Sequence, residues 1–146
     1  MKILIVEDNA MQADWMNQEL TRRLPKIEID MCDTECEFHA NFENIAANPP
    51  DVVLMDVMLN WTHPAENMVP RPPAIAEAGI WRAGIRCEKL LRTDPRTRDI
   101  PVVLYTSLAE SNLAADLKEM PQAAYLPKDS NFEPLVRQIQ STLKKK

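Results

Sequence analysis

Short apolar runs alternate with longer amphipathic segments along this chain. Residues 3–6, 51–56 and 100–105 contain nearly continuous apolar runs, which are typical of strands buried on both faces of a sheet. Residues 27–31 alternate apolar and polar side chains, as a strand with one wetter face does, and residues 123–126 form another short run. The pattern therefore predicts five strands.

Each predicted strand is followed by a segment with helical spacing of its apolar side chains. Pro25 ends the first of these segments, and Thr34 with Glu37 three residues later forms a capping box at the start of the second. The predicted helices are residues 9–24, residues 34–47, a helix that ends near Arg92, residues 109–120 and residues 130–143.

Strands that alternate with helices indicate an α/β domain, with a parallel sheet covered on both faces through right-handed connections. A chain of 146 residues is consistent with one domain, residues 1–146. One connection does not fit the usual length of about 2–6 residues. Residues 60–80 contain four prolines and separate the third strand from its helix, so we interpret them as an insertion.

Composition excludes several functions. The chain has only two glycines beside twelve prolines, so it has neither a GxGxxG motif nor a P-loop, and we expect no nucleotide cofactor. Its net charge of −5 argues against direct binding of nucleic acid. Its apolar runs are far shorter than the about 20 residues of a membrane span, and too short for a signal peptide.

Cysteine usage bears on the compartment. Three cysteines cannot all pair within one chain, which favours a reducing, cytoplasmic location. Cys32, Cys36 and His39 lie close enough in sequence to suggest zinc. Because a structural zinc site usually has four ligands, half-buried thiols are the alternative interpretation.

Polar residues follow four of the five predicted strands. They are Glu7 with Asp8, Asp56, Thr106 and Lys128. The carboxyl ends of parallel strands meet at one edge of a sheet, where ligands bind, so these side chains should converge. Each of them alone has an ordinary explanation, such as a helix cap or a surface lysine, and it is their coincidence that predicts a site.

The chemistry of this set is coherent. Carboxylate oxygens are the ligands that Mg²⁺ prefers, and an aspartate carboxylate can attack phosphorus. Clustered carboxylates repel a phosphoryl donor unless cations neutralise them, and Mg²⁺ with the Lys128 ammonium would do so.

Four segments carry a resemblance to a known family. Residues 2–9 (KILIVEDN), 51–59 (DVVLMDVML), 100–107 (IPVVLYTS) and 125–128 (YLPK) resemble the receiver domain of two-component response regulators, the CheY-like family. The resemblance covers the chain apart from the proline-rich insertion. It implies a flavodoxin-like (βα)5 doubly wound fold with strand order 2-1-3-4-5.

The resemblance also implies roles for individual residues. Asp56 would accept a phosphoryl group from a sensor histidine kinase or a histidine phosphotransfer protein. Mg²⁺ would be held by Glu7, Asp8, Asp56 and the backbone carbonyl of Met58. Lys128 would contact the phosphoryl group, Thr106 would be the switch hydroxyl, and Tyr125 would be the switch aromatic.

The expected function is a phosphorylation-switched signalling module rather than a conventional enzyme. By resemblance its output face is the fourth helix, the fifth strand and the fifth helix, and the chain would be a stand-alone receiver without an output domain. A degenerate receiver that binds proteins without phosphorylation is the alternative. A phosphohydrolase of the haloacid dehalogenase type would have a second aspartate where Met58 stands. The sequence leaves open whether the chain forms a homodimer.

Several positions depart from the family pattern. Asp129 follows Lys128 where receivers usually have proline, often after a cis peptide bond, and Asn60 replaces another common proline. Met58 and Leu108 occupy two positions that commonly tune the lifetime of the phosphoryl group. Because both are apolar and could hinder an attacking water, we expect slow autodephosphorylation.

The interval between Asp56 and Thr106 is longer than in the family. Gly84 matches the usual glycine at the start of the third helix, and we expect this helix to extend back to near Ala74, with residues 60–73 as an irregular arm. Two interpretations of the arm stay open. In one, Trp61 and Trp81 pack back onto the domain around a tolerated insertion. In the other, the arm docks a partner or a second copy.

Overall fold

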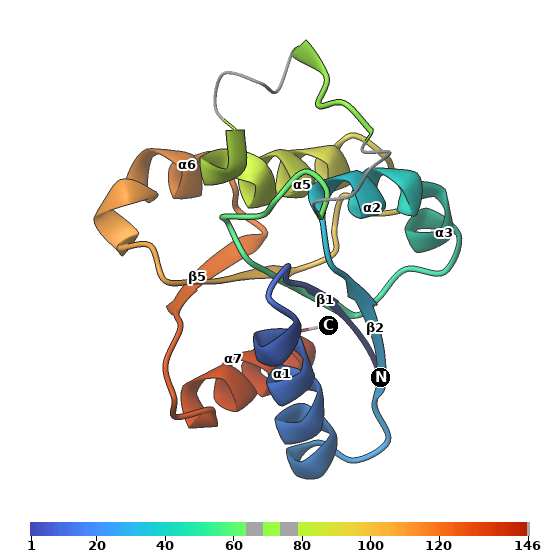
Figure 1. Ribbon diagram of the computed structural model, residues 1–146. Helices are drawn as coiled ribbons and strands as arrows, with labels where there is room; N and C mark the ends of the chain where they lie inside the picture. The colour runs from blue at the N-terminus through green and yellow to red at the C-terminus, as the bar shows by residue number, and fades with distance from the viewer. Residues whose placement is uncertain (64–68, 74–78, 146) are drawn as a thin grey trace.

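A five-stranded parallel sheet lies at the centre of the computed structural model, which describes residues 1–63, 69–73 and 79–145 (Figure 1). The strand order β2-β1-β3-β4-β5 confirms the predicted doubly wound topology. The strands are β1 (Lys2–Val6), β2 (Glu28–Cys32), β3 (Val52–Met55), β4 (Val102–Thr106) and β5 (Ala123–Pro127).

Helices cover both faces of the sheet (Figure 1). On one face lie α1 (Ala10–Arg23) and α7 (Glu133–Lys144), and on the other α2 (Glu35–Ala40), α3 (Phe42–Ala47), α5 (Ala83–Arg92) and α6 (Ala114–Lys118). Successive residues of β1 alternate between the two cores: Ile3 and Ile5 pack toward α1 and α7, and Leu4 and Val6 pack toward the other layer. None of these helices has the length and apolar character needed to span a membrane.

The predicted helix over residues 34–47 is wrong in one respect, because it is two short helices. Asn41 ends α2 and begins α3 with its backbone outside the helical region. Asparagine competes for backbone hydrogen bonds, which favours such breaks. Thr34 caps α2 as predicted, with its hydroxyl accepting from the Glu37 N–H at 3.1 Å, but the Glu37 carboxylate accepts from the Asp33 N–H instead of closing the box on Thr34.

The predicted helix over residues 109–120 is also interrupted. The structure has a 3₁₀ turn, η2 (Glu110–Asn112), followed by the five-residue α6. Ser111 and Asn112 are poor helix formers in its first turn. Only Leu113 and Met120 at the two ends of α6 are buried, so little packing energy is available to extend the helix.

The insertion is described in part. Residues 60–63 and 69–72 belong to no helix or strand, as expected for an irregular arm. The predicted helical extension from Ala74 falls on residues 74–78, outside the described residues, and the 3₁₀ turn η1 (Gly79–Arg82) leads directly into α5. Trp61 is half-buried, but Trp81 is 62% exposed, so the interpretation in which both tryptophans pack back onto the domain is wrong for Trp81.

Candidate functional site

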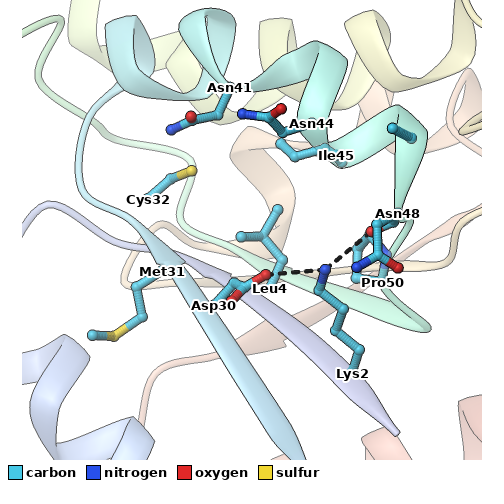
Figure 2. Close-up of a pocket in the computed structure, with 11 residues that line it drawn as sticks. Lys2, Leu4, Asp30, Met31, Cys32, Asn41, Asn44, Ile45, Asn48 and Pro50 are labelled. Atoms are coloured by element: carbon cyan, nitrogen blue, oxygen red, sulfur yellow. Dashed lines mark hydrogen bonds and ion pairs between the residues drawn. The ribbon is translucent and has the colours of Figure 1, made fainter.

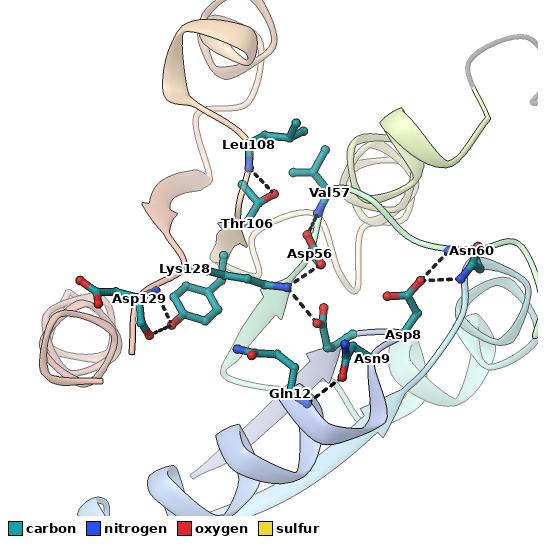
Figure 3. Close-up of polar contacts among 12 residues, drawn as sticks. Asp8, Asn9, Gln12, Asp56, Val57, Asn60, Thr106, Leu108, Lys128 and Asp129 are labelled. Carbon is teal, nitrogen blue, oxygen red and sulfur yellow. Dashed lines mark hydrogen bonds and ion pairs between the residues drawn. The ribbon is translucent and has the colours of Figure 1, made fainter. Parts of the chain in front are cut away.

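The predicted polar residues converge at the carboxyl edge of the sheet (Figure 3). Glu7 and Asp8 follow β1, Asp56 follows β3, Thr106 ends β4 and Lys128 follows β5. Glu7, Asp56 and Thr106 are buried, although Asp8 is half-exposed. The strand register that buries the apolar runs therefore also brings these distant positions together.

Three carboxylates form the floor of this site. Glu7, Asp8 and Asp56 each offer an oxygen within 4.8 Å of those of the other two. Among the described residues, this is the only group of three or more carboxylate, histidine or cysteine side chains close enough to share a metal ion. The zinc alternative at Cys32, Cys36 and His39 therefore has no geometric support, and the three cysteines are free thiols.

Lys128 joins two of the carboxylates. Its Nζ donates to Glu7 Oε1 and to Asp56 Oδ2, both at 2.8 Å. Burial on its own lowers the pKa of Lys128, but the hydrogen bonds and charges of Asp56 and Glu7 outweigh it, so the pKa is raised and the lysine stays protonated. The ammonium lies where it could neutralise charge on Asp56.

The site disfavours the charged form of Glu7. Burial raises its pKa to about 8, with further raising by Asp56 against the opposing pull of Lys128. Its second oxygen, Oε2, is buried without a hydrogen-bond partner. A buried carboxylate oxygen without a partner is costly, which indicates that this cluster is built for another cationic ligand.

The donor set fits Mg²⁺. When all three carboxylates are ionised, as metal ligands are, they and the one ammonium leave an excess of two negative charges. One divalent cation balances that excess, and oxygen ligands suit Mg²⁺. Glu7 Oε2 and the free oxygen of Asp8 are available protein ligands, together with Asp56. The Met58 carbonyl stays a predicted ligand.

Gly84, in the first turn of α5, holds the backbone next to Asp56. Its N–H donates to the Val57 carbonyl at 2.8 Å, so the first turn of α5 packs directly on the backbone after Asp56. A Cβ at position 84 would lie 2.0 Å from the Asp56 carbonyl oxygen, so only glycine allows this approach. The Asp56 side chain is also fixed locally, because Oδ1 accepts from the Val57 N–H at 2.7 Å.

The two predicted switch residues meet at Leu108. The Thr106 hydroxyl oxygen accepts from the Leu108 N–H at 3.2 Å, and the Tyr125 hydroxyl donates to the Leu108 carbonyl at 2.7 Å. One loop residue thus contacts both side chains. Their switching roles stay predictions, but the contacts give a physical link between them.

The loop after β5 is held without the usual proline. The Lys128–Asp129 peptide bond is trans, as are the other described peptide bonds. The hydroxyl of the buried Tyr105 donates to the Asp129 carbonyl at 3.2 Å and accepts from the Asp129 N–H at 3.3 Å. Sequence reasoning missed this role of Tyr105, because the two residues are far apart in the chain.

The insertion also reaches the site, through Asn60. Its backbone N–H and its Nδ2 both donate to Asp8 Oδ2, at 3.0 and 2.9 Å (Figure 3). The sequence showed only that Asn60 stands where receivers often have proline. A proline could donate neither of these bonds. The replacement of proline by asparagine was therefore the one sign in the sequence that this position could contact Asp8.

A separate groove of about 460 Å³ lies beside the edge strand β2 (Figure 2). Lys2, Asp30 and three asparagines are among its lining residues. The Lys2 ammonium is already used by Asp30 at 3.1 Å and by the Asn48 carbonyl at 3.0 Å. The groove therefore offers no free charge comparable to the acidic site.

Comparison with solved structures identifies the fold. Over 99% of its length the chain superposes on 98% of the signal receiver domain of a DNA-binding response regulator protein (merR) from Colwellia psychrerythraea 34H, with a TM-score of 0.70 and 21% identity. The receiver domain of the Francisella response regulator 1452 gives 0.69 and 18% identity, covering 99% of this chain and 97% of that one. The phosphorylated cyanobacterial phytochrome response regulator RcpA gives 0.64 and 20%, covering 98% and 89%. No protein-family model and no curated protein matches the sequence. The fold is thus that of response regulator receiver domains, as the resemblance implied.

Proposed function

We propose that this protein is a phosphorylation-dependent signalling module that accepts a phosphoryl group on Asp56. The observation that carries the proposal is the arrangement around Lys128, whose Nζ bridges Glu7 and Asp56 while an Asp8 oxygen lies close to both carboxylates. The receiver fold of the solved relatives supports the same conclusion.

The proposed reaction is a simple transfer. An Asp56 carboxylate oxygen attacks phosphorus and forms an acyl phosphate, while the bond from phosphorus to the donor imidazole nitrogen breaks. That electron pair stays on the nitrogen of a histidine kinase or histidine phosphotransfer protein. Mg²⁺ bound by Glu7, Asp8 and Asp56 would supply charge neutralisation. Lys128 would orient on the incoming phosphoryl oxygens and offset their charge.

The protein acts in this scheme as an acceptor rather than as a conventional enzyme. The new group adds about −1.5 to −2 charges beside Thr106. When the Thr106 hydroxyl turns toward the phosphoryl oxygens, the Leu108 N–H loses its partner, and this loosens the residue whose carbonyl accepts from Tyr125. The signal would then pass to a cytoplasmic protein partner through α6, β5 and α7, with the insertion as a second candidate surface.

The decisive experiment is labelling by acetyl phosphate or phosphoramidate with Mg²⁺. Wild type should be labelled, Asp56→Asn should not, and Asp14→Asn, which changes an exposed aspartate on α1, should match wild type. Equal labelling of wild type and Asp56→Asn would place the acceptor elsewhere. No labelling of wild type would favour a phosphorylation-independent interaction module.

A further inference from the structure

Asn60 is the one described residue of the insertion that bonds to the acidic cluster. Both of its donors converge on a single oxygen, Asp8 Oδ2. Figure 3 shows the other oxygen of Asp8 on the side of Asp56. Asn60 thus occupies the solvent side of the Asp8 carboxylate and leaves its inner side open.

This contact opposes an unfavourable force. Asp8 is half-exposed and lies near two other carboxylates, so charge repulsion favours turning its side chain toward water. The two hydrogen bonds from Asn60 favour the inward orientation instead. Hydrogen bonds to a ligating carboxylate orient it, and removing them commonly weakens metal binding about 10- to 100-fold.

Asn60 is itself held from two sides. Its carbonyl accepts from the Glu35 N–H at 3.0 Å, and the carbonyl of Trp61 accepts from the Cys36 N–H at 2.9 Å. On the other side, the Leu59 N–H donates to the Ile80 carbonyl at 3.2 Å. The start of the insertion is therefore bonded to the start of α2 and to η1, which fixes the backbone from which the exposed Asn60 side chain reaches Asp8.

We propose that Asn60 is a positioning residue of the Mg²⁺ site, by which the insertion holds Asp8 in place to bind the ion. The inference rests on the proposed function, because it assumes that Asp8 is a Mg²⁺ ligand. It gives the insertion a role in the chemistry of the site that its length and composition do not suggest.

The test compares Mg²⁺ affinity in matched variants. Asn60→Ala and Asn60→Leu both remove the side-chain donor, and the leucine nearly keeps the size. His63→Ala is the control, because it removes another contact of the same segment, to Asp33 at 2.9 Å, without touching Asp8. Titration calorimetry gives the dissociation constants, and the Mg²⁺-dependent rise in Tm gives an independent readout.

Both Asn60 variants should bind Mg²⁺ about tenfold or more weakly, as other outer-shell changes do, with unchanged stability in EDTA. His63→Ala should bind like wild type. Unweakened binding by the Asn60 variants overturns this inference alone. Equal weakening by His63→Ala also overturns it, because the loss would then come from a loosened insertion. If wild type itself fails to bind Mg²⁺, the proposed function falls with it.

Discussion

Gly84 offers a sharp test of how the fold positions Asp56. In Gly84→Ala, the new Cβ would lie 2.0 Å from the Asp56 carbonyl oxygen and 2.7 Å from Val57 Cα. Ordinary contact begins at 3.4 Å, so the shortest distance is too small by about 1.4 Å. Both neighbours are backbone atoms and cannot turn aside, so α5 and the chain after Asp56 must separate.

The cost can be worked out from these contacts. Overpacking against rigid backbone costs about 3 kcal/mol, and losing the hydrogen bond from Gly84 to the Val57 carbonyl adds about 1 kcal/mol. The higher helix propensity of alanine offsets about 1 kcal/mol of this loss. The free energy of unfolding should therefore fall by about 3 kcal/mol, which lowers Tm by roughly 6–12 °C in a domain of this size.

The other glycine of the chain is the matched control. Gly79 has φ +53°, and a Cβ there would lie 3.5 Å from Arg71 Nη1, which is ordinary contact. Gly79→Ala therefore suffers only the left-handed backbone, a cost of about 1–2 kcal/mol. Urea denaturation measures both variants, and acetyl phosphate labelling of the folded protein should be slower only in Gly84→Ala. A Gly84→Ala protein as stable as wild type, or less affected than Gly79→Ala, would refute the reasoning.

Three further predictions concern the loop, the buried ion pair and the lifetime of the phosphoryl group. Tyr105→Phe removes the hydroxyl that bonds both backbone groups of Asp129, and so loosens the loop that carries Lys128. Acetyl phosphate labelling should therefore slow several-fold, while the affinity for Mg²⁺ stays unchanged. A parallel loss of labelling rate and Mg²⁺ affinity would contradict this. Burial alone raises the pKa of Glu35, but its bonds to Arg86 outweigh burial and hold the pKa below the ordinary 4.5. Because the unfolded chain binds the Glu35 proton at a higher pH than the folded protein does, the free energy of unfolding should drop as pH falls below 4.5. The drop should be shallower in Glu35→Gln. Parallel curves of stability against pH for the two proteins would contradict a stabilising pair between Glu35 and Arg86. Met58→Asn replaces an apolar side chain beside the acceptor with one that can orient water, so the acyl phosphate should hydrolyse faster than in wild type, whose half-life should far exceed seconds.

The hydrophobic pattern predicted the strands and the site for one physical reason. Strands buried on both faces need continuous apolar runs, and the first polar residue after such a run marks the edge of the sheet. Glu7 and Asp56 therefore stood out in the sequence before any contact was known. Strand order came from the family resemblance rather than from periodicity, which specifies faces but not neighbours.

The helix interruptions and the contacts around the site could not be predicted in the same way. A single residue such as Asn41 can break a helix whose apolar spacing looks continuous, because the outcome depends on tertiary packing. The bonds from Asn60 to Asp8 and from Tyr105 to Asp129 join residues far apart in sequence. Neither bond produces a periodic pattern of apolar residues in the sequence. The exposure of Trp81 likewise depends on how the insertion folds.

The insertion is anchored near both of its ends by contacts with other parts of the fold. At its start, Asn60 bonds to Asp8 in the acidic site, and two residues past its end Arg82 of η1 forms an ion pair with Asp116 on α6. A surface insertion is tolerated if its ends meet, because the loop-closure cost grows slowly with length. Both contacts involve elements of the proposed function, because Asp8 is a proposed metal ligand and α6 belongs to the proposed output face. The Leu59 N–H donates to the Ile80 carbonyl and so joins the two ends of the segment, and the exposed Trp81 lies next to Arg82 in the chain. The interpretation of the insertion as a docking surface therefore stays a prediction.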